Sequence, residues 1–294
     1  MTDPGRAGLR RAPSRYLWFT LRFDRLSARA LPRGRAAAVA GAAAAVGLVL
    51  APFVLFTAVW ALVVGVTRWP EDVLPSPSAV ARAFGEVFAK GILTVYAGET
   101  IRRIVLAAVT GVAIGIAAGF VMGLNDWIAA LLNPPLRFFQ SLSGIAWLPL
   151  FLIWFGFSDK TIVVAVWYTL VFPVAFNTML GVRTVPRLYR YAVLTLGGTW
   201  RQIVFQVLLP GAIPYIVGGV RLGIAYGWRA LIAAEIVVGS GGLGYLIFKA
   251  ETFHLTARII AGMTAIGVLW YLTDYFLLRP LEEATIERWG LVYR

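Results

Sequence analysis

Long apolar runs constrain the fold of this chain more than any other feature. No charged residue lies between Arg35 and Arg68, and similar runs cover residues 104–124 and 161–180. A helix needs roughly 20 apolar residues to cross a bilayer. Hydrophobic residues make up 60% of the 294 residues and charged residues only 14%, whereas soluble domains average about 45–50% and about 25%. We therefore expect an all-α, polytopic helical membrane protein rather than a barrel of short alternating segments.

The apolar pattern predicts about six transmembrane helices. They cover approximately residues 36–66, 104–124, 127–155, 161–180, 213–238 and 259–278. We expect the third to be broken at residues 133–135 (Asn-Pro-Pro) and again at 141–144, because proline removes a helix hydrogen bond. Broken helices are tolerated at membrane depth only inside protein or beside a cavity. In the second span Gly111, Gly115 and Gly119 repeat every four residues, which predicts close packing within one subunit.

Basic residues are concentrated beside the predicted spans. Residues 1–35 hold nine arginines and two acids, and the segment 181–210 holds four arginines and no acid. Such segments are typical of the cytoplasmic side, so we expect both termini and the 181–210 loop there. The net charge of +13 then indicates anionic lipid rather than nucleic acid as the partner of the basic arm. The predicted organisation is a basic arm (1–35), a transmembrane domain (36–280) and a cytoplasmic tail (281–294).

The sequence lacks the residues that most enzyme and metal sites need. It has no cysteine and a single histidine, His254, which excludes thiolate sites and histidine clusters. No G-x4-G-K-[ST] phosphate loop occurs, so ATP hydrolysis by this chain alone is not expected. We also find no nucleophile–base set. The chain is therefore predicted not to be an enzyme, and to bind no metal or cofactor of its own.

The 181–210 loop carries its own helix signals. Residues 187–196 form an amphipathic pattern, and the two glycines at 197–198 predict a sharp turn, because glycine adopts positive φ without steric cost. Residues 199–202 (Thr-Trp-Arg-Gln) match a capping box at the start of a second helix. We expect that helix to cover residues 200–208 and to end at the following proline, giving a helix–turn–helix unit that docks on something outside the membrane.

Several motifs resemble those of one transporter family. In the loop, Tyr-Ala-Val at 191–193, Gly197 and Val-Leu-Leu-Pro at 207–210 follow the spacing of the motif E-A-A-x3-G-x9-I-x-L-P. Further similar motifs are L-P-S-P-S-A-V at 74–80, A-W-L-P-L-F-L-I-W-F-G at 146–156, F-P-V-A-F-N-T at 172–178, G-W-R-A-L-I-A-A-E at 227–235 and G-G-L-G-Y-L-I at 241–247. Together they resemble the permease subunits of binding-protein-dependent ABC importers, in the nitrate, sulfonate, taurine and bicarbonate branch.

The resemblance implies a type I ABC importer permease architecture in the inner (plasma) membrane. In that family the loop helices insert into a cleft of a cytoplasmic ATPase, which binds ATP and Mg. The other implied partners are a second, identical permease copy and an extracytoplasmic substrate-binding protein. The residues that the resemblance assigns to ATPase coupling are Arg190, Tyr191, Ala192, Gly197, Gly198 and Arg201.

Two segments depart from the family pattern. Tyr191 replaces the motif glutamate, and residues 140–144 (Gln-Ser-Leu-Ser-Gly) replace R-P-I-P-P. The first change removes any ion pair made through that glutamate. The second lies at the broken span, where we expect substrate preference or gating to differ.

The fifth predicted span carries three charges, which are costly in a membrane unless they face a cavity or a partner helix. Arg221 and Glu235 share a helical stripe with Trp228, and Arg229 lies to one side. Either the two arginines attract an anionic solute, or Arg229 and Glu235 pair with neighbouring spans as gate or scaffold. We favour the second interpretation, because the resemblance includes this pair whatever the solute. The candidate pathway or gate residues are Gln140, Ser141, Ser143, Arg221, Trp228, Arg229 and Glu235.

The predicted function is thus an ATP-driven importer permease for a small, anionic solute. The alternative is a secondary transporter driven by an ion gradient. That class needs no docking loop, and its inverted repeats have no counterpart in this sequence. Nitrate, bicarbonate, an organosulfonate and a small heterocyclic vitamin precursor all stay open as solutes.

Overall fold

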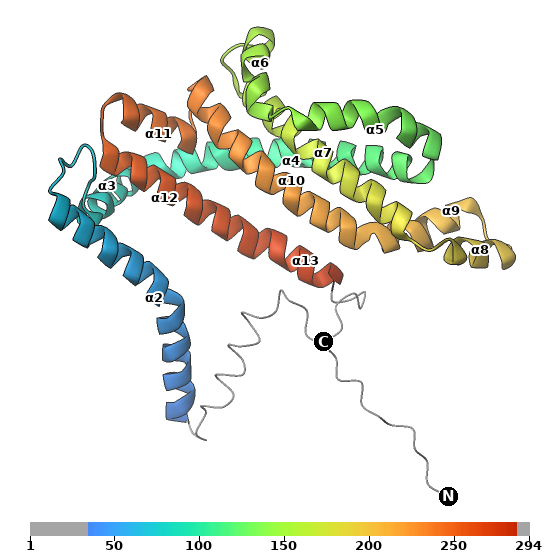
Figure 1. The fold of residues 1–294 in the computed structure, drawn as a ribbon, viewed down its shortest axis with the longest axis horizontal. Helices are drawn as coiled ribbons and strands as arrows, with labels where there is room; N and C mark the ends of the chain where they lie inside the picture. Colours follow the sequence, from blue (N-terminus) through green and yellow to red (C-terminus); the bar gives the residue numbers. More distant parts are fainter. Residues whose placement is uncertain (1–34, 287–294) are drawn as a thin grey trace, which may run out of the picture. The chain divides into compact units, whose positions relative to one another are not determined.

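The structure, a computed structural model, describes residues 35–286. Within this range every element is helical (Figure 1). The helices are α2 (Arg35–Thr67), α3 (Pro77–Ala89), α4 (Ile92–Leu124), α5 (Asp126–Ser141), α6 (Leu148–Phe155), α7 (Asp159–Thr184), α8 (Arg187–Thr195), α9 (Trp200–Gln202), α10 (Leu209–Val238), α11 (Leu243–Thr252), α12 (Thr256–Thr273) and α13 (Arg279–Ile286). The predicted basic arm and residues 287–294 of the tail lie outside the described residues.

Three short segments join these helices. A 3-10 turn, Gly144–Trp147, precedes α6. The π-helical segments Ile203–Leu208 and Asp274–Leu278 join α9 to α10 and α12 to α13 without a break. The α9–α10 stretch is therefore one continuous helix, Trp200–Val238, of 39 residues.

Two units make up the chain. The first contains α2, which holds the apolar stretch Leu50–Thr67 and has Pro52 inside the helix. The second begins at Trp69 and contains all the other helices. Across the described residues five helices are long and apolar enough to cross a membrane, and six if the bent pair of α5 with Gly144–Phe155 counts as one span. The prediction of an all-α protein with about six spans is confirmed.

The third predicted span is bent at one place rather than broken at two. α5 continues through Pro134 and Pro135, and the chain turns by 84° only after Ser141. The predicted break at 133–135 was therefore wrong. Proline fixes φ near the helical value and costs mainly the hydrogen bond to the residue four positions earlier. The carbonyl groups left free belong to Ala130 and Leu131, both in exposed residues.

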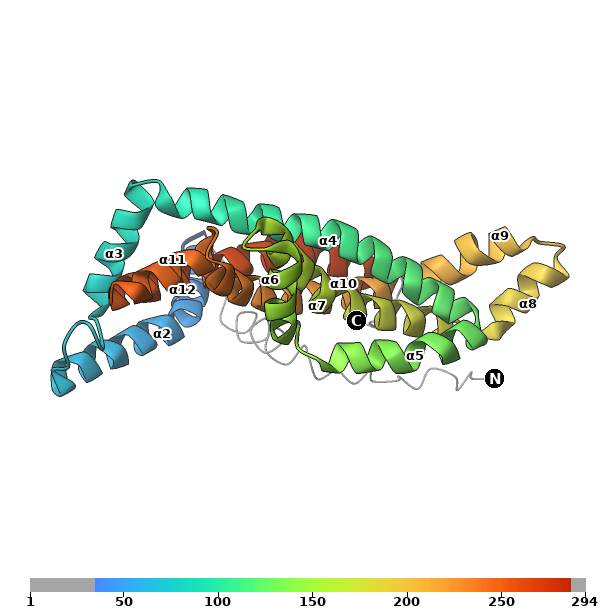
Figure 2. The ribbon, with the colours of Figure 1, turned by 90° about the horizontal axis from the view of Figure 1, so that it is seen from above.

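α7 lies at the centre of the second unit, with α4 and α10 packed along it (Figure 2). Glycines of α4 make the close approach possible, and those at 111, 115, 119 and 123 are buried. A Cβ at Gly115 would lie 2.8 Å from Val174 Cβ, and one at Gly123 would lie 2.6 Å from Val182 Cβ. α10 uses the same device, since a Cβ at Gly219 would lie 2.6 Å from Asn177 Cβ. The predicted packing of the glycine stripe within one subunit is confirmed.

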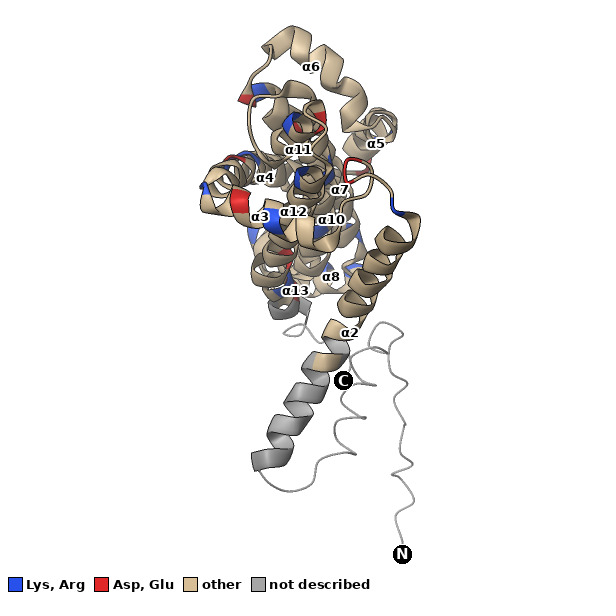
Figure 3. Cartoon of the chain, turned by 90° about the vertical axis from the view of Figure 1, so that its left-hand side faces the viewer, with Lys and Arg blue, Asp and Glu red and all other residues tan. Residues whose placement is uncertain are grey.

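The two ends of this unit carry different short helices. α3 and α11 lie at one end, and the hairpin of α8 and α9 lies at the other (Figure 2). α3 begins at Ser76, whose Oγ accepts a hydrogen bond from the Ala79 backbone N–H at 3.2 Å, and it carries charged residues that face the viewer in Figure 3. α6, by contrast, contains no charged residue.

Candidate functional site

The α8–α9 hairpin has the glycine turn and the cap that the sequence predicted, but its second helix is longer than predicted. Gly197 has φ of +77° with open space where a Cβ would stand, and the Gly198 N–H donates to the Val193 carbonyl at 2.8 Å. The predicted capping box is confirmed, with the Thr199 backbone N–H donating to Gln202 Oε1 at 2.6 Å. The second helix does not end at Pro210, because the π-helical segment carries it into α10 and Pro210 lies in the first turn of that helix.

The hairpin exposes a mixed apolar and basic surface. Leu196 is 87% exposed and Tyr191 is 60% exposed, and Arg201 and Ala192 are also exposed. Residues 181–210 contain no acid, so this surface carries positive charge only. Arg190 differs from its neighbours: it is half-buried, and its Nη2 donates to the Val182 carbonyl at 3.3 Å. It therefore fixes α8 to the end of α7.

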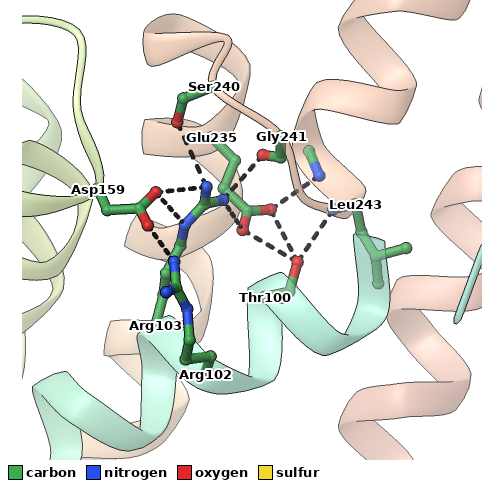
Figure 4. A network of polar contacts seen from close by, with 9 residues as sticks. Thr100, Arg102, Arg103, Asp159, Glu235, Ser240, Gly241 and Leu243 are labelled. Atoms are coloured by element: carbon green, nitrogen blue, oxygen red, sulfur yellow. Dashed lines mark hydrogen bonds and ion pairs between the residues drawn. The ribbon is translucent and has the colours of Figure 1, made fainter. Parts of the chain in front are cut away.

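A buried polar network lies at the other end of the unit (Figure 4). Its centre is Arg103 of α4, which is 1% exposed. Arg103 Nη1 donates to Glu235 Oε1 at 2.9 Å and to the Gly241 carbonyl at 2.8 Å, and Nη2 donates to Asp159 Oδ1 at 2.6 Å. Arg102 also pairs with Asp159. One arginine thus joins α4, the start of α7 and the end of α10.

The carboxylate of Glu235 is fully buried and fully bonded. It accepts from Thr100 Oγ1 at 2.9 Å and, at Oε2, from the Gly244 backbone N–H at 2.9 Å. Thr100 Oγ1 in turn accepts from the Leu243 N–H at 2.9 Å. Gly242 has φ of +93°, and any side chain there would overlap the carboxylate. Glu235 therefore pairs with a neighbouring span, as expected for this residue, and also bonds the start of α11.

Arg221 and Trp228, two other candidate residues of the fifth span, also contact neighbouring helices. Arg221 Nη2 donates to Asp274 Oδ1 at 3.0 Å, and the same guanidinium pairs with Glu282. Trp228 is buried against Trp270, with ring centroids 5.7 Å apart. Arg221 is thus neutralised by two acids, and Trp228 belongs to the core.

Arg229, with Gln140 and Ser143, lines a separate cavity of about 350 Å³. The other lining residues are Leu142, Gly144, Ile145, Tyr168, Thr169, Phe172, Pro173, Tyr226 and Ala230. The structure therefore brings these three predicted pathway residues together at the bend after α5. Ser141 is not among the lining residues, and its hydroxyl donates to the Phe138 carbonyl at 2.7 Å. The expected ion pair of Arg229 with a neighbouring span does not occur among the side chains that the structure describes; its guanidinium lies 5.9 Å from the Tyr226 ring centroid.

Sequence reasoning missed Arg103, Asp159 and Thr100. The predicted second span starts at residue 104 and leaves Arg103 outside it, whereas α4 begins at Ile92 and places Arg103 in the interior. A signal was present, because a buried glutamate in a span requires a cationic partner from another helix. The sequence did not identify which of the arginines outside the fifth span was that partner.

The sequence and the fold of this chain are each similar to those of known proteins. Residues 111–278 match the family described as "Binding-protein-dependent transport system inner membrane component". The chain is 31% identical over 214 residues to the taurine transport system permease protein TauC of Escherichia coli, covering 73% of this chain and 77% of that protein. It is 30% identical over 247 residues to the putative aliphatic sulfonates transport permease protein SsuC of Bacillus subtilis, covering 84% and 88%.

Two further likenesses extend the comparison. The chain is 34% identical over 179 residues to the bicarbonate transport system permease protein CmpB of Synechococcus elongatus, covering 60% of this chain and 62% of that protein. In fold it is similar to a chain of the MetNI methionine ABC transporter in an inward-facing conformation, with a TM-score of 0.52 and 18% identity, covering 66% of this chain and 97% of that chain.

Proposed function

Because the chain belongs to the family of binding-protein-dependent transport system inner membrane components, we propose that it is the permease subunit of an ATP-driven importer. The observation that carries this proposal is the α8–α9 hairpin, a capped helix–glycine–helix unit with an exposed apolar and basic surface. Such a surface fits a cleft of a separate ATPase, which would bind ATP and Mg and supply the energy. The hairpin and both termini then lie in the cytoplasm.

The proposed solute is small and carries an oxyanion group, and an extracytoplasmic binding protein delivers it. The support is twofold. The relatives TauC, SsuC and CmpB are named for taurine, aliphatic sulfonates and bicarbonate, which all carry such a group. In the second unit, Arg229 has no acidic partner among the described residues, and it lines a cavity. We propose that two copies of the chain together form the pathway.

Gly197 gives the sharpest test of the docking role. Its φ of +77° disfavours a β-branched residue, whereas asparagine tolerates this region. Gly197→Val is expected to lower ATP-driven uptake and co-purification of the ATPase by about tenfold or more, since a distortion worth about 1.4 kcal/mol already changes binding tenfold. Gly197→Asn should retain both, and Gly218→Ala is a matched control because a Cβ there meets no atom within 4 Å.

The measurement is uptake of isotope-labelled nitrate, taurine and bicarbonate by vesicles that contain the chain with its ATPase and binding protein. Membrane insertion is checked for each variant. Normal coupling in Gly197→Val would contradict the docking assignment. Uptake that persists without the ATPase and follows an imposed ion gradient would establish the secondary-transporter alternative instead.

A further inference from the structure

We propose that the cavity lined by Arg229 binds a single monovalent oxyanion during its passage through the membrane unit. The inference rests on the proposed function, and it assigns the solute-binding step to particular residues: Arg229 of α10 and Gln140 and Ser143 at the bend after α5.

The first argument is charge. Arg103, Arg221 and Arg229 all lie in helices that are apolar enough to cross a membrane. Arg103 and Arg221 each meet two carboxylates. Arg229 has no ion pair within the described part of the chain, and its side chain is exposed beside Tyr226. An unneutralised charge at membrane depth is costly, so a mobile anion is the group that this position lacks.

The second argument is the supply of hydrogen-bond donors. Ser143 Oγ accepts from the Ile145 N–H at 3.4 Å, which leaves its own O–H free to donate. Among the described side chains and backbone groups, Gln140 has no side-chain hydrogen bond, so its amide N–H groups are also available to donate. The hydroxyls of Tyr168 and Thr169, by contrast, already donate to the Phe139 and Ala165 carbonyls.

The third argument is the volume of the cavity and the charge of the residues that line it. The cavity volume of about 350 Å³ is near the lower end of the roughly 300–1,000 Å³ typical of small-molecule sites. Arg229 is the one charged residue in its lining. A monovalent anion would be neutralised there, whereas a divalent one would leave a net negative charge in the membrane. The aromatic side chains of Tyr168, Phe172 and Tyr226 complete the wall.

The absence of cysteine from the sequence permits a direct test that does not require the natural solute. Ser143→Cys is introduced into the full chain in membrane vesicles and labelled with an anionic sulfonatoethyl thiosulfonate or a cationic trimethylammonium-ethyl thiosulfonate. The ratio of the two labelling rates is compared in backgrounds with Arg229, Arg229→Lys and Arg229→Gln. Ser78→Cys on α3, an exposed position, and Arg82→Gln are the controls.

We expect Ser143→Cys to favour the anionic reagent, and Arg229→Gln to lower the rate ratio by about tenfold or more, the effect of one nearby charge in a partly desolvated site. Arg229→Lys should restore most of the preference for the anionic reagent. The rate ratio at Ser78→Cys should not change with either substitution of Arg229. In the complete transporter, Arg229→Gln should also lower uptake of the transported anion by at least tenfold.

An unchanged rate ratio in Arg229→Gln, or a cysteine at 143 that neither reagent reaches in membranes, would overturn the inference. So would normal anion uptake by the Arg229→Gln transporter. The proposed function fails differently, through loss of ATP dependence in the unmodified transporter, and the labelling ratio is read without ATP.

Discussion

The buried network around Arg103 predicts a specific order of stabilities. Arg103→Gln leaves the carboxylate of Glu235, which is 0% exposed, without a cation. Removing one partner of a buried pair costs about 3–5 kcal/mol. In a domain of about 150–250 residues, a loss of about 1 kcal/mol in the free energy of unfolding lowers the melting temperature by about 2–4 °C. The melting temperature of Arg103→Gln should therefore fall by about 6–20 °C.

Glu235→Gln should lower the free energy of unfolding by a smaller amount, about 1–3 kcal/mol. Arg103 then still meets Asp159 through Nε at 3.0 Å and Nη2 at 2.6 Å. In the double variant both buried charges are gone, and Asp159 keeps Arg102 and is 41% exposed. The double variant should therefore lose less than the sum of the two single losses, by about 1–3 kcal/mol.

The assay is unfolding of the purified chain in detergent, followed by the fluorescence of its 11 tryptophans. Arg82→Gln is the control, because Arg82 is exposed on α3. The reasoning fails if Arg103→Gln melts with the control, if Glu235→Gln is the more damaging change, or if the two losses simply add.

Three further variants test the packing and the caps. Gly115→Leu should lower the melting temperature in the same assay, because overpacking costs about 1–3 kcal/mol or more. Gly98→Leu on the same helix, where a Cβ meets nothing within 4 Å, should be tolerated. Gln202→Met removes the acceptor of the capping box and should cost about 0.5–2 kcal/mol, seen as faster amide exchange at the start of α9; unchanged exchange would count against the box. Ser76→Ala should lower stability by about 1 kcal/mol through the lost cap of α3, and Ser78→Ala should not; equal effects would show that the Ser76 cap contributes little.

Much of the fold could be predicted because it depends on local patterns. The apolar runs give the spans, and the glycine turn with its capping box gives the hairpin before any tertiary contact is known. The glycine spacing of the second span likewise predicts a close helix contact. These features need only the neighbours along the chain.

The features that were missed depend on partners distant in sequence. Arg102 and Arg103 are adjacent, but one is exposed and the other buried, because the helix turns only the second toward α7 and α10. Whether Pro134 breaks a helix depends on whether the freed carbonyl is exposed. Whether Arg229 meets an acid among the described residues depends on which face of α10 meets α7, and the sequence alone left that open.

The unbroken helix from Trp200 to Val238 has a mechanical consequence. Its 39 residues extend for about 58 Å at about 1.5 Å per residue, from the hairpin surface at one end to the Glu235 bonds at the other. A tilt of about five degrees around the midpoint of a rod this long moves its tips by about 2.5 Å in opposite directions. A displacement of that size is enough to separate two hydrogen-bonded side chains. We expect the tilt of this helix to change three things at once: the contact of the hairpin with the proposed ATPase, the position of Arg229, and the hydrogen bonds between Arg103 and Glu235.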